Sequence, residues 1–249
     1  MTRIIAVANH KGGVGKTTTV ASVGAILASK GKRTLLIDLD AQANLTSCFL
    51  QQEPDQTIYN AMKGEVGLPI INVRQNLDLV ASSLDMAGIE LDIASRLSRE
   101  FILKKLLKPV AANYDYVLLD NPPSLGLVTV NSFVTATELF IPLTAEALPT
   151  KGLQRLLDIL QMVQDGLNDT IRLSGVIITR WEGSNISRGI EQQLRDLFGS
   201  SIFKTKIRKN VSIVEAQLYA KDIVTYAPKS NGAKDYESLT EEILAQERK

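Results

Sequence analysis

Hydrophobic positions along the chain follow two alternating spacings. Short, nearly continuous apolar runs, typical of buried parallel strands, occupy residues 4–8, 34–37, 77–81, 116–119, 139–143 and 173–179. Between these runs the apolar residues recur every three or four positions, which predicts helices over residues 17–30, 89–108, 150–168, 186–198, 212–220 and 233–246. Strands separated by helices need crossover connections. We therefore expect an α/β fold: a doubly wound, mostly parallel sheet with helices on both faces.

The longest predicted helix, residues 89–108, ends before Pro109. Its inward face would carry Ile93, Leu97, Phe101 and Leu107. Neither a repeat nor a linker-like stretch interrupts the alternation of strands and helices. We therefore expect residues 1–249 to form a single domain.

A glycine-rich segment lies between the first predicted strand and the first predicted helix. It reads NHKGGVGKTT over residues 9–18, which matches the phosphate-binding pattern G-x-x-x-x-G-K-[ST] except for His10 in place of the first glycine. Backbone N–H groups of such loops, together with the positive end of the following helix, bind phosphate oxygens. We expect Lys16 to reach the β- and γ-phosphates and Thr17 to bind Mg²⁺. Further nucleotide contacts are expected from Lys11, Gly12, Gly13, Val14, Gly15 and Thr18.

Aspartates stand at the ends of two other predicted strands. Asp38 and Asp40 end the second strand, and Asp120 ends the fourth. Because ligands of doubly wound sheets bind at the carboxyl ends of the strands, we expect these carboxylates beside the glycine-rich loop. Carboxylates fixed by buried strands suit a Mg²⁺ site next to phosphate. The alternative is that each aspartate only caps a helix or forms a turn, but the intact G-K-T-T sequence favours the metal site.

Composition narrows the chemistry further. Cys48 is the only cysteine, which excludes an intrachain disulfide and a cysteine-rich metal cluster within one chain. His10 is the only histidine, which argues against Ser–His–Asp catalysis and histidine-based metal sites. The net charge is +1, so nucleic-acid binding requires local clustering of basic residues. The chain starts directly with a predicted strand and has no apolar run of about 20 residues. We therefore expect neither a signal peptide nor a membrane span, and a cytoplasmic protein.

Several segments together carry a family resemblance. The sequences KGGVGKT (residues 11–17), DLDAQAN (38–44) and DNPPSLG (120–126) resemble those of the deviant-Walker P-loop ATPases, and most closely the ParA/Soj partition ATPases. The similarity extends through residues 207–216 and from residue 233 into the last helix. The chain departs from the family at Asn121, where relatives usually have cysteine, and at residues 207–209, which read Ile-Arg-Lys where relatives often have Ile-Pro-Arg.

The resemblance implies roles for the matching residues. Asp38 would support the Mg²⁺ site, Asp120 would hold a Mg-bound water, and Asp40 would position or activate the attacking water. Lys11 would reach across a two-fold interface to the phosphates of a partner subunit, which makes hydrolysis depend on an ATP-bound homodimer. The alternative for Lys11 is a loop cation that only raises the affinity for ATP.

Four further residues are candidates for nucleotide contacts. Glu146 and Lys151 follow the predicted strand 139–143 and would contact the partner subunit or its ribose. For Lys151 the alternative is an exposed residue at a solvated helix start. Base contacts carried over from the family would fall on Arg208 and Asn210.

Basic residues are concentrated near the C-terminus. Residues 201–234 contain seven lysines and arginines, opposed only by Glu215 and Asp222, for a formal charge of +5. A dimer of such segments would bind the phosphate backbone of DNA without reading its bases. The expected DNA contacts are Arg188, Lys204, Lys206, Lys209, Lys221, Lys229 and Lys234.

Together these features predict an ATPase switch. Mg·ATP would produce a homodimer that binds nonspecific DNA on the nucleoid, a ParB-like adaptor protein would stimulate hydrolysis, and plasmid, chromosome or protein cargo would be positioned. One alternative is a MinD-like membrane-positioning ATPase, but the last helix is acidic and its apolar residues form a core-facing stripe of Tyr236, Leu239, Ile243 and Leu244. The other alternative is a biosynthetic P-loop enzyme that acts on a small molecule. The position of Lys11 argues against this alternative.

Overall fold

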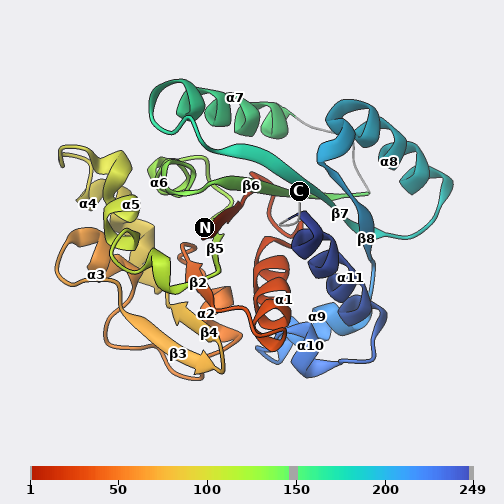
Figure 1. Ribbon diagram of the computed structural model, residues 1–249, viewed down its shortest axis with the longest axis horizontal. Coiled ribbons are helices and arrows are strands. Elements are labelled where there is room, and N and C mark those ends of the chain that lie inside the picture. Colours follow the sequence, from red (N-terminus) through yellow and green to blue (C-terminus); the bar gives the residue numbers. More distant parts are fainter. Residues whose placement is uncertain (1, 146–150, 247–249) are drawn as a thin grey trace.

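The computed structural model describes residues 2–145 and 151–246. Within them eight strands form one sheet in the order β3-β4-β2-β5-β1-β6-β7-β8 (Figure 1). All neighbouring strands are parallel except β3 and β4. The strands are β1 (Arg3–Val7), β2 (Thr34–Asp38), β3 (Ile70–Arg74), β4 (Leu77–Val80), β5 (Tyr116–Asp120), β6 (Glu138–Thr144), β7 (Arg172–Trp181) and β8 (Ile202–Arg208).

Helices cover both faces of the sheet (Figure 1). α1 (Lys16–Ser29) and α11 (Asn231–Gln246) pack together on one face, and α6 (Leu127–Thr135) and α7 (Lys151–Gly166) pack on the other. The other α-helices are α2 (Asn44–Ser47), α3 (Ile58–Lys63), α4 (Ile89–Asp92), α5 (Ile102–Leu107), α8 (Asn185–Phe198), α9 (Val211–Leu218) and α10 (Ile223–Tyr226). The predicted doubly wound sheet is thus confirmed. No helix in the described part of the chain is long and apolar enough to cross a membrane.

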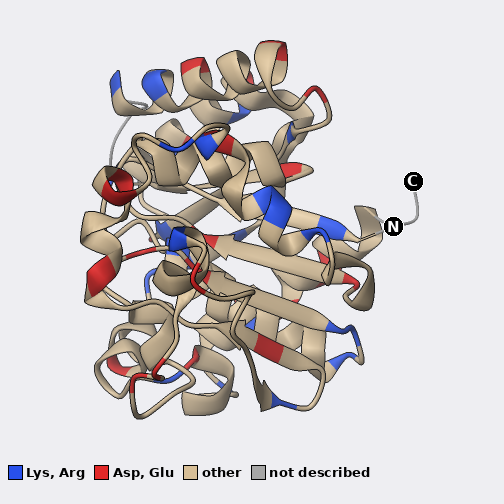
Figure 2. Ribbon diagram, turned by 90° about the vertical axis from the view of Figure 1, so that its left-hand side faces the viewer, with Lys and Arg blue, Asp and Glu red and all other residues tan. Residues whose placement is uncertain are grey.

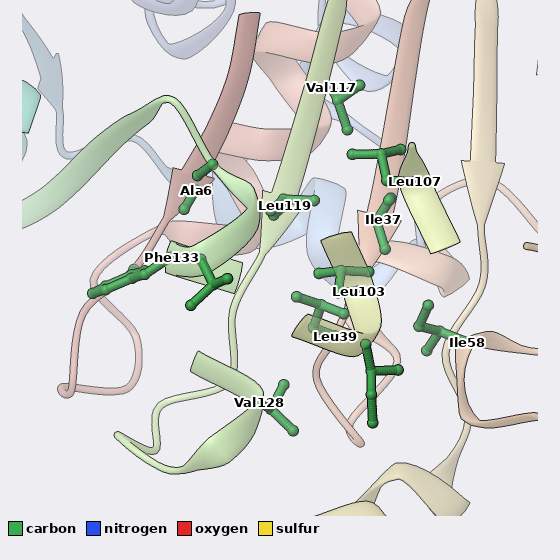
Figure 3. Packing of buried hydrophobic residues seen from close by; sticks show 14 of the residues in the cluster. Ala6, Ile37, Leu39, Ile58, Leu103, Leu107, Val117, Leu119, Val128 and Phe133 are labelled. Carbon is green, nitrogen blue, oxygen red and sulfur yellow. The ribbon is translucent and has the colours of Figure 1, made fainter. Parts of the chain in front are cut away.

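The central strands are apolar on both sides because each side meets a layer of helices. Ile37, Val117 and Leu119 face the layer that contains α5 and α6, where they meet Leu103 and Phe133 (Figure 3). Their neighbours in sequence point the other way, toward α1 and α11. This two-sided burial explains why the strands read as continuous apolar runs rather than as alternating patterns.

The predicted long helix over residues 89–108 is wrong. The segment forms α4, a turn, and α5, and Ser98 between them has a positive φ of 56°. Leu97, expected to face inward, is 96% exposed. The buried side chain of Asn131 donates to the carbonyl of Arg99 (2.8 Å) and accepts the N–H of Leu103 (3.1 Å). A contact from α6 therefore binds backbone groups that a continuous helix would pair internally.

The apolar pattern also does not predict the two edge strands. β8 carries Lys204 and Lys206 beside the buried Phe203 and Ile207, because only one side of this edge strand is well covered. β3 is a short strand that runs antiparallel to β4 at the opposite edge.

Candidate nucleotide site

The glycine-rich loop joins β1 to α1, and two glycines shape its backbone. Gly13 and Gly15 have positive φ angles of 70° and 93°, which residues with a Cβ rarely adopt. α1 begins directly after Gly15, and no side chain in the described residues caps its first turn. The N–H groups at this helix start are therefore available to an anion such as phosphate.

Two side chains outside the glycine-rich pattern hold the loop in place. Asn9, which is buried, donates through Nδ2 to the carbonyl of Pro142 on β6 (2.7 Å) and accepts the N–H of Lys11 at Oδ1 (3.0 Å). Tyr236 of α11 lies beneath the loop, fully buried, with its Oη 3.3 Å from Oγ1 of Thr19. Sequence reasoning assigned neither contact. The polar side chain of Asn9, three positions before Gly12, was the only local signal.

The two lysines of the loop lie in opposite environments. Lys16 is 7% exposed, and its Nζ donates to the carbonyl of Lys11 at 3.4 Å. Burial lowers the pKa of Lys16, while the nearby carboxylates of Asp120 and Asp40 oppose that shift. Lys11 is exposed to solvent. One loop therefore presents one lysine to its own cavity and another to the outside.

Asp38 and Asp120 are neighbours across the sheet, because they end β2 and β5 at the same register position. The carboxylate of Asp38 accepts three hydrogen bonds: at Oδ2 from the N–H and the hydroxyl of Thr46 (both 2.8 Å), and at Oδ1 from the N–H of Asp40 (3.1 Å). Burial nevertheless raises the pKa of Asp38 to about 6. Asp38 thus fixes the backbone of Asp40 and Thr46, a role that its strand-end position alone does not reveal.

Asp120 lies in the opposite situation. Both of its carboxylate oxygens are buried, and neither has a partner at normal hydrogen-bond distance among the described residues, although the Thr17 hydroxyl is close enough to act as a weak donor. Burial and the adjacent Asp38 raise the pKa of Asp120 well above its usual range, with Thr17 and Lys16 acting the other way. An unsatisfied buried carboxylate next to a phosphate loop fits a cation such as Mg²⁺ or its bound water.

A magnesium ion would still need further ligands. No three His, Cys, Asp or Glu side chains in the described part of the chain are grouped to hold a metal by themselves. Mg²⁺ in such sites usually keeps several waters and takes oxygens from phosphates and from one or two side chains. The hydroxyl of Thr17, which lines the same cavity as Asp40, can complete such a set.

Two adjoining cavities open at the loop. The first, about 400 Å³, lies over the phosphate-binding part and is lined by Gly12, Gly13, Gly15, Lys16, Thr17, Thr18 and Asp40, among others. The second, about 360 Å³, shares Gly13, Gly15 and Thr18 with the first and also includes Val14, Arg208 and Asn210. Both expected base-contact residues already have structural partners. Arg208 pairs with Asp235 (2.6 Å), and Oδ1 of Asn210 caps α9 by accepting the N–H of Ser212 (2.8 Å).

Of the two remaining candidates near the loop, the structure describes only one. Glu146 lies outside the described residues. Lys151 is exposed and is the first residue of α7. The next residue, Gly152, approaches His10 so closely that a Cβ there would lie 2.9 Å from its ring. The start of α7 is therefore packed against the glycine-rich loop.

The C-terminal basic residues fall into two groups. Three have acidic partners: Lys206 with Glu191 (3.0 Å), Arg208 with Asp235 (2.6 Å) and Lys209 with Glu182 (2.6 Å). These acids lie outside residues 201–234, so the formal charge of that segment overstates its free positive charge. The others are exposed and form no ion pair within the described residues: Arg188, Lys204, Lys221, Lys229 and Lys234. The molecule's opposite side, around α3 to α5, carries interspersed basic and acidic residues (Figure 2).

Comparison with known proteins identifies the family. A model described as an AAA domain matches residues 2–173. The chain is 38% identical over 251 residues to the sporulation initiation inhibitor protein Soj of Bacillus subtilis, covering 98% of this chain and 99% of the relative. It is 36% identical to the chromosome-partitioning ATPase Soj of Treponema pallidum, with 99% of both covered.

A solved structure shows the same fold with ligands bound. Cobyrinic acid a,c-diamide synthase from Mycobacterium smegmatis, with an ATP analogue and magnesium, matches with a TM-score of 0.87 and 31% identity, covering 100% of this chain and 96% of that chain. Its name describes a biosynthetic enzyme. Both sequence relatives above are more similar in sequence, at 38% and 36% identity against 31%. The chain belongs to the ParA/Soj family of P-loop partition ATPases.

Proposed function

We propose that this ATPase is a partition switch whose hydrolysis depends on a homodimer. ATP and Mg²⁺ bind at the glycine-rich loop, two copies close over two nucleotides, and the dimer binds nonspecific DNA on the nucleoid. A ParB-like adaptor protein then stimulates hydrolysis, and ADP releases the subunits.

The contrast between the two loop lysines carries this proposal. Lys16 is buried and directed into its own cavity, whereas Lys11 is exposed although its backbone is fixed by Asn9. An exposed cation on a fixed backbone suits the phosphates of a partner subunit. Phosphoryl transfer depends on positioning and on neutralising the developing charge, so a lysine supplied by the partner would act like an arginine finger.

Within one subunit, we assign the roles of the other site residues from their positions around the cavity. Thr17 and Asp120 would hold Mg²⁺ or its waters, and Asp38 would support that site by fixing the backbone of Asp40. Asp40 lines the phosphate cavity and would position the attacking water. Glu146 and Lys151 remain proposed contacts to the partner subunit.

The Lys11→Ala variant tests dimer-dependent hydrolysis. We expect it to bind ATP with nearly wild-type affinity in titration calorimetry, but to lose the increase in ATPase rate with protein concentration. The control is Lys104→Ala, which removes an exposed lysine on α5. A Lys11→Ala protein whose specific activity rises with concentration as in the wild type contradicts the switch.

DNA binding is proposed for the exposed basic residues that lack acidic partners. Lys204→Glu with Lys234→Glu, two exposed residues that line neither cavity, should reduce ATP-dependent binding to random-sequence DNA and flatten its dependence on salt. Lys206→Gln should have a smaller effect, because Glu191 already neutralises that charge. DNA binding that needs no ATP, or that does not change with salt, contradicts the proposal.

A biosynthetic function is the second candidate, because the matching synthase shares the fold. ATPase rates measured with and without DNA separate the two. A partition switch turns over slowly alone and accelerates with DNA and an adaptor, whereas a biosynthetic enzyme responds to neither.

A further inference from the structure

A hydrogen bond connects the start of α1 to the end of α9. Nε2 of Gln217 donates to Oγ1 of Thr18 at 2.7 Å, across 199 positions of sequence. Thr18 lies in the first turn of α1, and Gln217 lies in the last turn of α9. This is the only hydrogen bond of the Gln217 side chain within the described residues. One amide N–H and the amide oxygen of Gln217 therefore remain available to a ligand.

The position of this contact indicates which part of a nucleotide it meets. Lys16 and Thr17 line the first cavity only, and these residues serve the β- and γ-phosphates and Mg²⁺. Thr18 and Gln217 line both cavities, so they stand where the two join. A nucleotide with its terminal phosphates in the first cavity and its base in the second places its α-phosphate and ribose at this junction.

The hydrogen-bond direction suits an anion at the junction. A hydroxyl has one donor and two acceptor sites. Because Thr18 accepts the N–H of Gln217, its own proton is free to be donated to a phosphate oxygen. A chain of hydrogen bonds that runs from amide to hydroxyl to phosphate strengthens each link through polarisation.

We propose that Gln217 is a nucleotide-binding residue that, together with Thr18, holds the α-phosphate side of a bound adenine nucleotide and so couples nucleotide occupancy to helix α9. This inference rests on the proposed ATP site and extends it to a helix outside the P-loop. Both ends of α9 adjoin the site, because its cap residue Asn210 lines the second cavity and Gln217 lines both cavities. Lys221, one of the proposed DNA contacts, follows α9 and lines the first cavity.

The test compares the affinities of Gln217 variants for ADP and ATP by titration calorimetry. Gln217→Glu should weaken both nucleotides about tenfold, because a carboxylate repels the α-phosphate and accepts the Thr18 proton that the phosphate would otherwise receive. ADP and ATP should lose the same factor, since both contain the α-phosphate. Gln217→Ala should weaken both by a smaller factor. Gln52→Glu, at an exposed loop position, is the matched charge control and should bind as the wild type does.

A second readout tests the coupling to α9. ADP should slow deuterium exchange over residues 211–218 in the wild type and in Gln52→Glu, but not in Gln217→Ala. Unchanged ADP affinity in a folded Gln217→Glu protein overturns the inference, and so does a loss confined to ATP, which would place Gln217 at the γ-phosphate. If the wild type itself binds neither nucleotide, the proposed function fails instead.

Discussion

Asp38 and Asp120 are the same residue type at the same register position on neighbouring strands, yet they differ in their hydrogen bonds. The carboxylate of Asp38 accepts three hydrogen bonds from Thr46 and Asp40, whereas neither oxygen of Asp120 has a partner at normal hydrogen-bond distance within the described residues. Three hydrogen bonds thus offset part of the cost of burying the Asp38 carboxylate without any ligand. The burial of Asp120 is offset only in part by Thr17 and Lys16, so a bound cation or a proton would stabilise it further. Burial alone therefore does not identify a ligand-binding carboxylate, whereas missing partners do.

The largest expected effect comes from removing the unsatisfied carboxylate. Asp120→Asn should lower the Mg²⁺-dependent ATPase rate about 1,000-fold, since metal stabilisation of transferring phosphate is worth several kcal/mol. A Mg²⁺ titration of steady-state hydrolysis measures the loss. An Asp120→Asn protein with the wild-type Mg²⁺ response would show that this carboxylate does not serve the metal.

The pH dependence of the nucleotide-free protein should follow the two raised pKa values. Because folding raises the pKa of Asp38 from 3.8 to about 6, this group favours the folded state at low pH and loses that contribution as the pH rises through 6. Ionisation of Asp38 should lower the free energy of unfolding by up to about 3 kcal/mol as the pH rises. Ionisation of Asp120, whose pKa is also raised, should lower it as well. Urea unfolding at a series of pH values measures it, and stability that rises from pH 4 to 7 contradicts it.

Asp120→Asn should also stabilise the nucleotide-free protein at pH 7.5. The amide still lacks partners but carries no charge, and because an unsatisfied buried charge costs more than an unsatisfied neutral group, the expected gain is about 2 kcal/mol. Thermal unfolding without Mg²⁺ or nucleotide measures the gain. A lower melting temperature than that of the wild type would mean that Asp120 has a partner in solution.

The smallest expected effect comes from breaking the hydrogen-bond network of Asp38. Thr46→Val removes the hydroxyl that donates to Asp38 and accepts the N–H of Ser82 (both 2.8 Å), so it should cost about 1 kcal/mol and raise the pKa of Asp38 further. The control is Thr240→Val, a buried threonine whose hydroxyl donates only to a carbonyl within its own helix. Equal losses in the two variants would remove the special role of Thr46.

Elements that are encoded by consecutive residues could be predicted from the sequence. The glycine-rich loop needs particular residues at consecutive positions, and buried parallel strands must be apolar on both sides, so both can be read directly from the chain. The core-facing residues Tyr236, Leu239 and Ile243 of the last helix are buried as predicted. Because parallel strands end at one edge, Asp38 and Asp120 also lie together as expected.

Features that depend on a contact with a distant segment could not be predicted from the sequence. The break in residues 89–108 depends on Asn131, and the charge of Lys206 and Arg208 depends on Glu191 and Asp235. None of these partners is adjacent in sequence. Local periodicity and charge counts cannot contain such information, because only the folded chain brings the partners together.

The support of the glycine-rich loop by Tyr236 has a consequence for biosynthesis. The loop is made first, within the first 20 residues, but the tyrosine beneath it belongs to the last helix. On the ribosome, a nascent chain that already carries the complete phosphate-binding sequence still lacks the floor of its site. A chain that ends before residue 231 would carry every residue of the phosphate-binding sequence and still lack the tyrosine beneath it.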